Sequence, residues 1–192
     1  MIKLGKNASA DECTECGNLI YYGGSNPCCD DGYDKYLEDL QILRHEAEHY
    51  IVSKYEKGNI DDELRKSELF SIIWYASTEI LPKLEVQVMI DSEDKIFVST
   101  GTAGYVDFKI DPAGMKLPIK CWIHTHPFGA AYFSGTDINS VSSWEPLLKK
   151  AYVLGGEGHY GSWSQEEPNE LQIYRNNVHE ETQVWNKGSE EE

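Results

Sequence analysis

The sequence predicts a mixed α+β domain in which a β-sheet is flanked by helices. Two long segments, 33–57 and 61–81, repeat apolar residues at helical spacing, and several short apolar or alternating stretches follow them. The 192 residues are enough for one substantial domain with a small appendage, and 40% of them are apolar, which suffices for a core.

The two amphipathic helices are predicted from their apolar stripes and from the residues at their ends. Gly58 and Asn59 end the first helix, whereas Asp61 and Asp62 suit the first turn of the second helix and Pro82 stops it. The stripe of the first helix contains Tyr36, Leu40, Leu43, Ala47, Tyr50 and Ile51. The stripe of the second helix contains Leu69, Ile72, Ile73, Ala76 and Ile80.

A series of strands is predicted after these helices. The segment 84–90 alternates, so its apolar residues share one face and Glu85, Gln87 and Met89 share the other. Further strands are predicted at 96–99, 105–110, 119–126, 151–154 and 171–174. Between them we expect turns at 91–94 and 111–114, a helix over 136–149 and a glycine-rich loop at 155–161.

The predicted organisation of the chain has four parts. We expect a Cys-rich module over 1–32, a connecting helix over 33–58, the main domain over 59–178 and an acidic disordered tail over 179–192. The first of these parts is rich in Cys, Gly, Asn and Asp, so we expect little regular structure in it.

A pair of histidines marks the most informative stretch, which reads HTHPFGAAYFSGTD from His124 to Asp137. It follows a mostly apolar run over 119–123, and on a strand the side chains of His124 and His126 point to the same face. Both imidazoles can therefore reach one ion, and Asp137 can return from the next element as a third ligand. Three protein ligands with one open position are typical of a catalytic zinc site.

Ser134 and Asp137 also have a structural interpretation. A serine followed by an acid three residues later, before an apolar segment, is typical of a capping box at the start of a helix. The two interpretations are compatible, because a helix N-terminus can hold Asp137 firmly and present it to a metal ion.

The stretch resembles the signature of the JAMM (MPN+, JAB-like) zinc metalloproteases: His-x-His-Pro, then Asp after ten intervening residues, with Ser three before the Asp. The likeness covers roughly 61–174. It implies an MPN/JAB-like, cytidine-deaminase-like mixed sheet, a catalytic Zn²⁺ held by His124, His126 and Asp137, and a Ser134 hydroxyl that stabilises the oxyanion of the tetrahedral intermediate.

The same resemblance implies a general base, a glutamate at the head of the strand after the first core helix. Glu85 heads the segment 85–90 and is the favoured candidate, whereas Glu79 is expected in the last turn of the helix. Val88 stands where the family commonly has glycine, which is a departure from its pattern.

The activity implied by this family is hydrolysis of an isopeptide or peptide bond at the C-terminus of a ubiquitin-like protein. The glycine-rich loop and its flanking strands would bind the extended tail by adding it to the sheet. Two alternatives stay open: a phage-tail-type JAB peptidase that acts on another protein, and a non-catalytic MPN-like scaffold.

Four of the five cysteines cluster in the first thirty residues, at Cys13, Cys16, Cys28 and Cys29. In an intracellular chain such clustering favours a metal over disulfides, so we expect a second, structural zinc ion in a knuckle-like module. Because the second half departs from Cys-x-x-Cys, His45 or His49 can alternatively supply the fourth ligand. The module would offer a docking site for a protein partner.

His45 to His49 also match the H-E-x-x-H pattern of another class of zinc protease. Helical geometry weighs against such a site, because both histidines fall opposite the apolar stripe of their helix, among charged residues. A solvated helix face is the interpretation we favour.

The formal net charge of −16 bears on the partners that we expect. Nucleic acids and anionic membranes attract basic surfaces, so neither is expected to bind. No apolar run is long enough to span a bilayer, and the N-terminal stretch has no apolar core of a signal peptide. We therefore expect a cytoplasmic protein.

Overall fold

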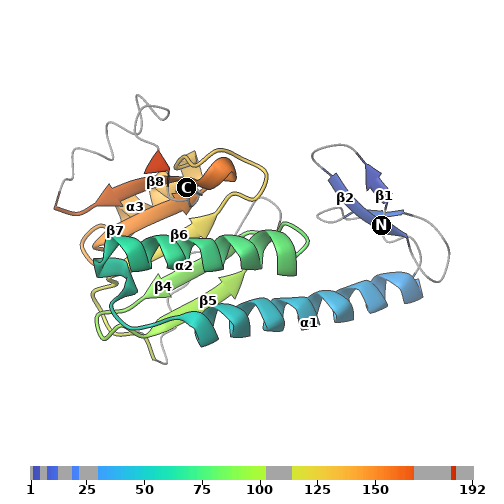
Figure 1. Cartoon of the computed structure of the whole chain (residues 1–192), viewed down its shortest axis with the longest axis horizontal. Helices are drawn as coiled ribbons and strands as arrows, with labels where there is room; N and C mark the ends of the chain where they lie inside the picture. The colour runs from blue at the N-terminus through green and yellow to red at the C-terminus, as the bar shows by residue number, and fades with distance from the viewer. Residues whose placement is uncertain are drawn as a thin grey trace, which may run out of the picture.

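The computed structural model describes the backbone of residues 2–4, 8–12, 19–21, 30–102, 114–166 and 183–184, and most side chains from residue 37 to 166 within these ranges. The part that it describes is a mixed α+β fold, as the sequence predicts. A six-stranded mixed sheet is covered by helices on both faces (Figure 1). A separate small sheet lies near the N-terminus of the chain.

The helical elements are α1 (Asp30–Lys54), the 3-10 turn η1 (Asn59–Asp61), α2 (Glu63–Tyr75), the π-helical turn η2 (Ala76–Ile80), α3 (Gly135–Trp144) and the 3-10 turn η3 (Gly156–Gly158). The strands of the large sheet are β4 (Val86–Ile90), β5 (Ile96–Thr100), β6 (Cys121–Thr125), β7 (Lys150–Leu154), β8 (His159–Ser164) and β9 (Gln183–Val184). Their order is β5-β4-β6-β7-β8-β9, and within it β6 and β7 are parallel while the other neighbours are antiparallel.

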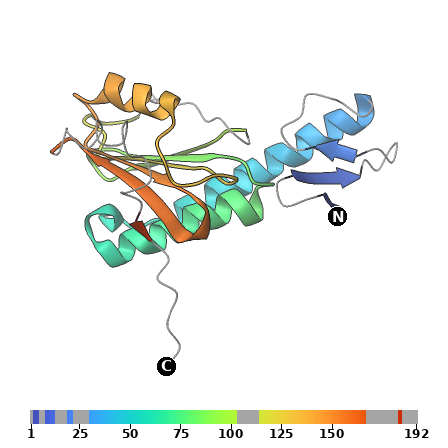
Figure 2. The ribbon, with the colours of Figure 1, turned by 90° about the horizontal axis from the view of Figure 1, so that it is seen from above.

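The large sheet separates two apolar clusters. Figure 2 shows the sheet between α3 on one side and α1 and α2 on the other. Val86, Val88 and Ile123 belong to the cluster beneath α1 and α2, whereas Met89 and Trp122 belong to the cluster beneath α3. Because both faces are covered, every residue of β4 and β6 is buried, although the alternation of the sequence correctly separates the two faces.

The register between β4 and β6 positions the histidine pair. Gln87 lies opposite His124, and Met89 lies opposite Trp122. Continued two residues beyond the last paired position, the same antiparallel register would set Glu85 opposite His126. The alternate face of β4 that carries Glu85 and Gln87 is therefore the face that carries both histidines.

Several element boundaries differ from the predicted ones. The first helix spans 30–54 instead of 33–57, and the second is divided into η1, α2 and η2. Helix α3 ends at Trp144 instead of 149, because Pro146 follows and Leu148 leaves the helix to bridge Ile119. Strand β8 occupies 159–164, where the sequence predicts a loop that continues to 161. The strands predicted at 105–110 and 171–174 lie outside the described residues.

The two ends of the chain contain more regular structure than the sequence predicts. Strands β1 (Ile2–Leu4), β2 (Ala8–Glu12) and β3 (Leu19–Tyr21) form a three-stranded antiparallel sheet, so the expectation of little regular structure in 1–32 is wrong. Within the segment predicted as a disordered tail, β9 pairs with β8. The pairing of β9 joins Val184 to His159, residues that are distant in sequence, which local composition does not reveal.

Candidate metal centre

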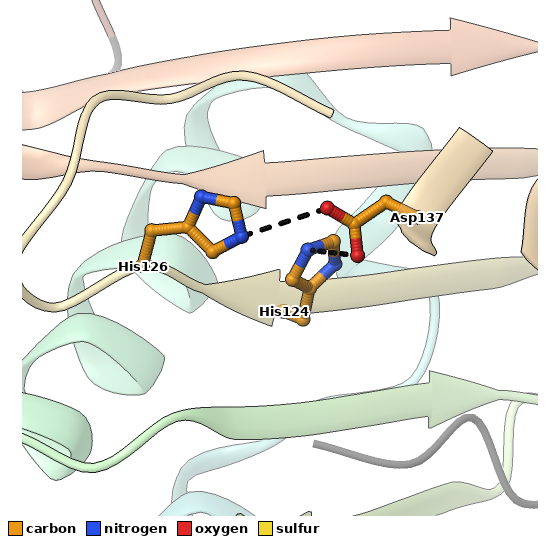
Figure 3. A group of neighbouring side chains, drawn as sticks. All are labelled: His124, His126 and Asp137. Atoms are coloured by element: carbon orange, nitrogen blue, oxygen red, sulfur yellow. Dashed lines mark ion pairs between the residues drawn. The ribbon is translucent and has the colours of Figure 1, made fainter. Parts of the chain in front are cut away.

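The strand β6 and the start of helix α3 bring His124, His126 and Asp137 together. His124 lies in β6, His126 follows its last residue, and Asp137 lies in the first turn of α3. Figure 3 shows the carboxylate of Asp137 facing both imidazoles. In the searched part of the chain, these three residues are the group of His, Cys, Asp and Glu side chains that could hold a metal ion.

A capping box fixes Asp137 at the start of α3. The backbone N–H of Asp137 donates to Ser134 Oγ at 3.2 Å, and the backbone N–H of Ser134 donates to Asp137 Oδ2 at 2.7 Å. The capping interpretation of the sequence is therefore confirmed. Ser134 Oγ accepts in this arrangement, so its own O–H is still able to donate a hydrogen bond.

The spacing of the three residues suits a small divalent cation. Nε2 of His124 lies 3.1 Å from Asp137 Oδ1, and Nε2 of His126 lies 3.6 Å from Asp137 Oδ2. Ligand atoms around a tetrahedral zinc ion lie roughly 3.3–3.6 Å apart, given metal–ligand distances of roughly 2.0–2.2 Å. The two separations lie close to this range, and the ligand atoms of the three residues all lie within 4.8 Å of one another, so the residues could hold such an ion.

His124 is buried, yet within the described part of the chain neither of its ring nitrogens makes a hydrogen bond. The contact of Nε2 with Asp137 is short but does not have hydrogen-bond geometry, which leaves a buried imidazole without the partner that such groups normally have. Burial also lowers the pKa of His124, and this effect outweighs the opposing influence of Asp137. A neutral imidazole with a free lone pair is the form that binds metals.

His126 and Asp137 lie beside it and shift each other's pKa values. Burial lowers the pKa of His126, but the interaction with Asp137 is stronger in sum and raises it. Burial raises the pKa of Asp137, but the contacts with the two histidines outweigh it and hold this pKa well below its usual range. Nδ1 of His126 lies 3.4 Å from the carbonyl oxygen of Ala130, so an N–H at Nδ1 leaves the Nε2 lone pair toward Asp137.

Glu85 lies beside this group, and Glu79 does not. Glu85 is only 6% exposed, at the head of β4. Burial raises its pKa to about 7, with smaller electrostatic influences from His126, which lowers it, and Asp137, which raises it. Glu79 is exposed in the π-helical turn η2. Of the two candidate bases, the structure therefore places Glu85 on the face of the sheet that carries both histidines.

Gln87, Ser77 and Thr125, which the sequence does not single out as functional, lie around this site together with Trp122. Trp122 stacks on His124 with ring centroids 4.5 Å apart, and its indole N–H donates to Gln87 Oε1 at 3.2 Å. Ser77 and Thr125 form a buried hydroxyl pair behind the strand. For Gln87, its position two residues after Glu85 on an alternating strand is a signal that sequence reasoning could have used.

The other candidate ligands lie elsewhere. His45, Glu46 and His49 are exposed on α1, as the helical geometry of the H-E-x-x-H segment predicts. Cys13, Cys16, Cys28 and Cys29 lie outside the described residues, so the structural zinc site stays a prediction. Cys121 is fully buried, and burial raises the pKa of its thiol.

Compared with known protein families, curated proteins and solved structures, the chain matches none of them. Among the helices in the described ranges, none has the length and apolar character needed to cross a bilayer. The interpretation of the site therefore depends on its own geometry and on the spacing of its residues.

Proposed function

We propose that the chain is a zinc-dependent metallopeptidase of JAMM type that hydrolyses an isopeptide or peptide bond at the C-terminus of a ubiquitin-like protein. The observation that supports this most is the convergence of His124, His126 and Asp137 from β6 and α3, with Glu85 on the same face. The fold we propose is the MPN/JAB-like one, which agrees with a mixed sheet covered by helices on both faces.

Zinc is the cation that this donor set favours. Two imidazoles and one carboxylate are typical ligands of a catalytic zinc ion and leave a position open. When bound, zinc supplies a Lewis acid that polarises the scissile carbonyl and makes a nucleophile available from water at neutral pH. The buried His124 without hydrogen bonds and the ionised Asp137 supply the neutral and anionic ligands that such an ion needs.

Glu85 is the proposed general base. Its carboxylate would take the proton of the attacking water and then deliver it to the leaving amine nitrogen, so that the glutamate ends as it began. Its burial at the head of β4 keeps its pKa near the working pH of such a step. Glu79 is exposed and takes no part in this proposal.

Ser134 is the proposed donor to the developing oxyanion. Its oxygen already accepts the N–H of Asp137, which orients the side chain, and its O–H is left to donate. The removal of one such donor typically costs roughly a hundredfold or more in kcat. The capping role and the catalytic role thus use different lone pairs and protons of one hydroxyl.

The substrate class in this proposal depends on the likeness between the His124–Asp137 stretch and the JAMM signature. Beside the site, the exposed ring of Tyr132 packs edge-on against His126 with centroids 5.4 Å apart. Phe128 is also exposed, and Lys83 Nζ lies 5.4 Å from its ring centroid. These rings offer apolar surface to an extended chain that enters beside the metal ligands.

Zinc content and isopeptide cleavage together test the proposal. We expect one zinc ion to be lost in the double variant His124→Ala/His126→Ala, together with all hydrolysis of a lysine-linked ubiquitin-like conjugate. Glu85→Gln should retain the ion and lose hydrolysis. The matched control is His45→Ala/His49→Ala, which removes two exposed histidines from α1. This variant should change neither the zinc content nor the hydrolysis.

Each alternative has its own signature in the same experiment. A scaffold binds the ion but leaves every conjugate intact, and an H-E-x-x-H protease loses activity in the α1 variant instead. A peptidase of the phage-tail type cleaves a peptide bond in another protein and spares the isopeptide conjugate.

A further inference from the structure

A π-helical turn just before β4 holds a buried serine. In η2 the backbone N–H of Leu81 donates to the carbonyl oxygen of Ala76 at 2.9 Å, which is an i to i+5 bond. Ser77 lies in this turn with no exposed surface. Turns of this kind are rare and occur frequently at functional sites, so the contacts of Ser77 are of interest.

Two hydrogen bonds join Ser77 to Leu84 and to Thr125, and a third joins Thr125 to Val86. Ser77 Oγ donates to the carbonyl oxygen of Leu84 at 2.7 Å, and it lies 2.9 Å from Thr125 Oγ1. The backbone N–H of Val86 donates to Thr125 Oγ1 at 3.0 Å. A hydroxyl has one proton. Because Ser77 donates its proton to the carbonyl of Leu84, it must accept the hydrogen bond from Thr125.

The hydrogen bonds therefore run in one direction, from Val86 N–H through Thr125 and Ser77 to the carbonyl of Leu84. Both ends of this series attach to the peptide groups on either side of Glu85. Thr125, in the middle of this series, lies between His124 and His126 in the sequence. The side chain of Thr125 points to the opposite face of the sheet from both histidines.

We propose that Ser77 and Thr125 are positioning residues that hold the backbone of Glu85 in a fixed place relative to the metal-binding strand. This inference rests on the proposed function, in which Glu85 moves the proton. Neither hydroxyl touches the reacting atoms, and both act through the peptide groups of Leu84 and Val86. We call this pair the hydroxyl clasp.

The physical case for the clasp is that its members are fully buried and fully satisfied. Ser77 and Thr125 have no exposed surface, and each of their oxygens has partners in the structure. A buried hydroxyl without a partner is costly, whereas a satisfied buried network is rigid. Thr125 is β-branched, so few rotamers are open to its hydroxyl.

Enzyme kinetics provide the first test. We expect Thr125→Val, which keeps the shape and removes the hydroxyl, to lower kcat by about 10- to 100-fold with KM within about twofold, because a small displacement of a catalytic group is costly. Thr125→Ser restores the hydroxyl and should recover most of kcat. The control Ile123→Val trims a buried side chain from the same face of the same strand and should leave kcat within about threefold.

A second test needs neither metal nor substrate. In the metal-free protein, amide hydrogen exchange at Val86 should accelerate about tenfold or more in Thr125→Val relative to wild type, with Val88 as the internal reference in the same strand. Ser77→Ala should have the same direction of effect and serves if Thr125→Val does not fold. Each folded variant should still bind one zinc ion.

These readings separate the two hypotheses. If the wild-type chain hydrolyses no conjugate, the proposed function fails, while the amide exchange of Val86 still decides whether the clasp exists. Unchanged exchange at Val86, an equal loss of kcat in Ile123→Val, or a loss of zinc in Thr125→Val would overturn the clasp even in an active enzyme.

Discussion

Gln87 lies directly opposite His124 where β4 pairs with β6, and its side chain accepts the indole N–H of the tryptophan that stacks on that histidine. The amide nitrogen of Gln87 is buried and has no hydrogen-bond partner among the residues that the structure describes. This residue thus fixes the ring against which His124 packs, from a strand that contributes no metal ligand.

Replacement of Gln87 should therefore weaken metal binding. In Gln87→Leu the indole N–H of Trp122 loses its acceptor, and we expect the zinc dissociation constant to rise about tenfold or more, as is common for residues that orient metal ligands. Titration against a chelator of known affinity measures it. Ser99→Ala, at the position opposite Gln87 on β5, is the control and should bind zinc like wild type. Equal affinities of Gln87→Leu and wild type would contradict the prediction.

Thermal denaturation should distinguish the capping role of Asp137 from its proposed role as a metal ligand. Asp137→Ala removes a cap partner and a ligand, so we expect the metal-free protein to lose about 1 kcal/mol and the stabilisation by added zinc to disappear. Ser134→Ala should lose a similar amount without metal but should still be stabilised by zinc. Scanning calorimetry with and without zinc measures both. A zinc-dependent rise of Tm in Asp137→Ala would show that the aspartate is not a ligand.

Glu85 should make the metal-free fold less stable as the pH rises. Its pKa is raised from 4.5 to about 7 by burial, so the folded state binds more protons than the unfolded state between these values. The contribution of Glu85 to the free energy of unfolding therefore falls as the pH rises from about 4.5 to about 7. Above that pH the carboxylate is ionised and the loss of stability is complete. The glutamine side chain in Glu85→Gln stays neutral, so this part of the decrease in the free energy of unfolding should be absent.

Urea denaturation of both proteins at a series of pH values, without metal, measures this difference. His126 and Glu85 influence each other electrostatically, so the difference between the two curves reports the ionisation of Glu85 together with this coupling. Parallel curves would mean that Glu85 is ionised and solvated in the folded state.

Gly155 should be intolerant of a side chain. A Cβ at this position would lie 2.2 Å from the backbone nitrogen of Ala131 and 2.6 Å from the carbonyl carbon of Ala130, whose oxygen contacts His126. Because backbone atoms cannot move aside cheaply, we expect Gly155→Ala to cost roughly 1–3 kcal/mol and to weaken zinc binding. Chemical denaturation and zinc titration measure the two effects.

Gly135 offers the matched control for that substitution. No atom lies within 4 Å of a Cβ built there, so Gly135→Ala should leave zinc binding unchanged. Its stability should be equal or slightly higher, because alanine favours the helix that begins at this residue. If both alanine variants behave like wild type, the close approach at Gly155 is relieved by movement of the 129–131 loop.

The sequence by itself determined the local features of the site. Two histidines at i and i+2 on a strand must share a face, and a serine three residues before an aspartate must start a helix that holds this acid in place. Alternation along 84–90 likewise separated the apolar face of β4 from the face of Glu85 and Gln87. Each of these outcomes follows from spacing within one element, which the chain carries in its order of residues.

Only the tertiary structure decided which distant residues meet. The sequence favours Glu85 over Glu79, and the β4–β6 register decides that Glu85 lies on the face of the sheet that carries both histidines. The register also placed Gln87 against His124, and a π-helical turn placed Ser77 against Thr125, 48 residues away. The physical reason is that strand pairing and helix packing satisfy buried hydrogen bonds and apolar area across the whole chain, which no local pattern specifies.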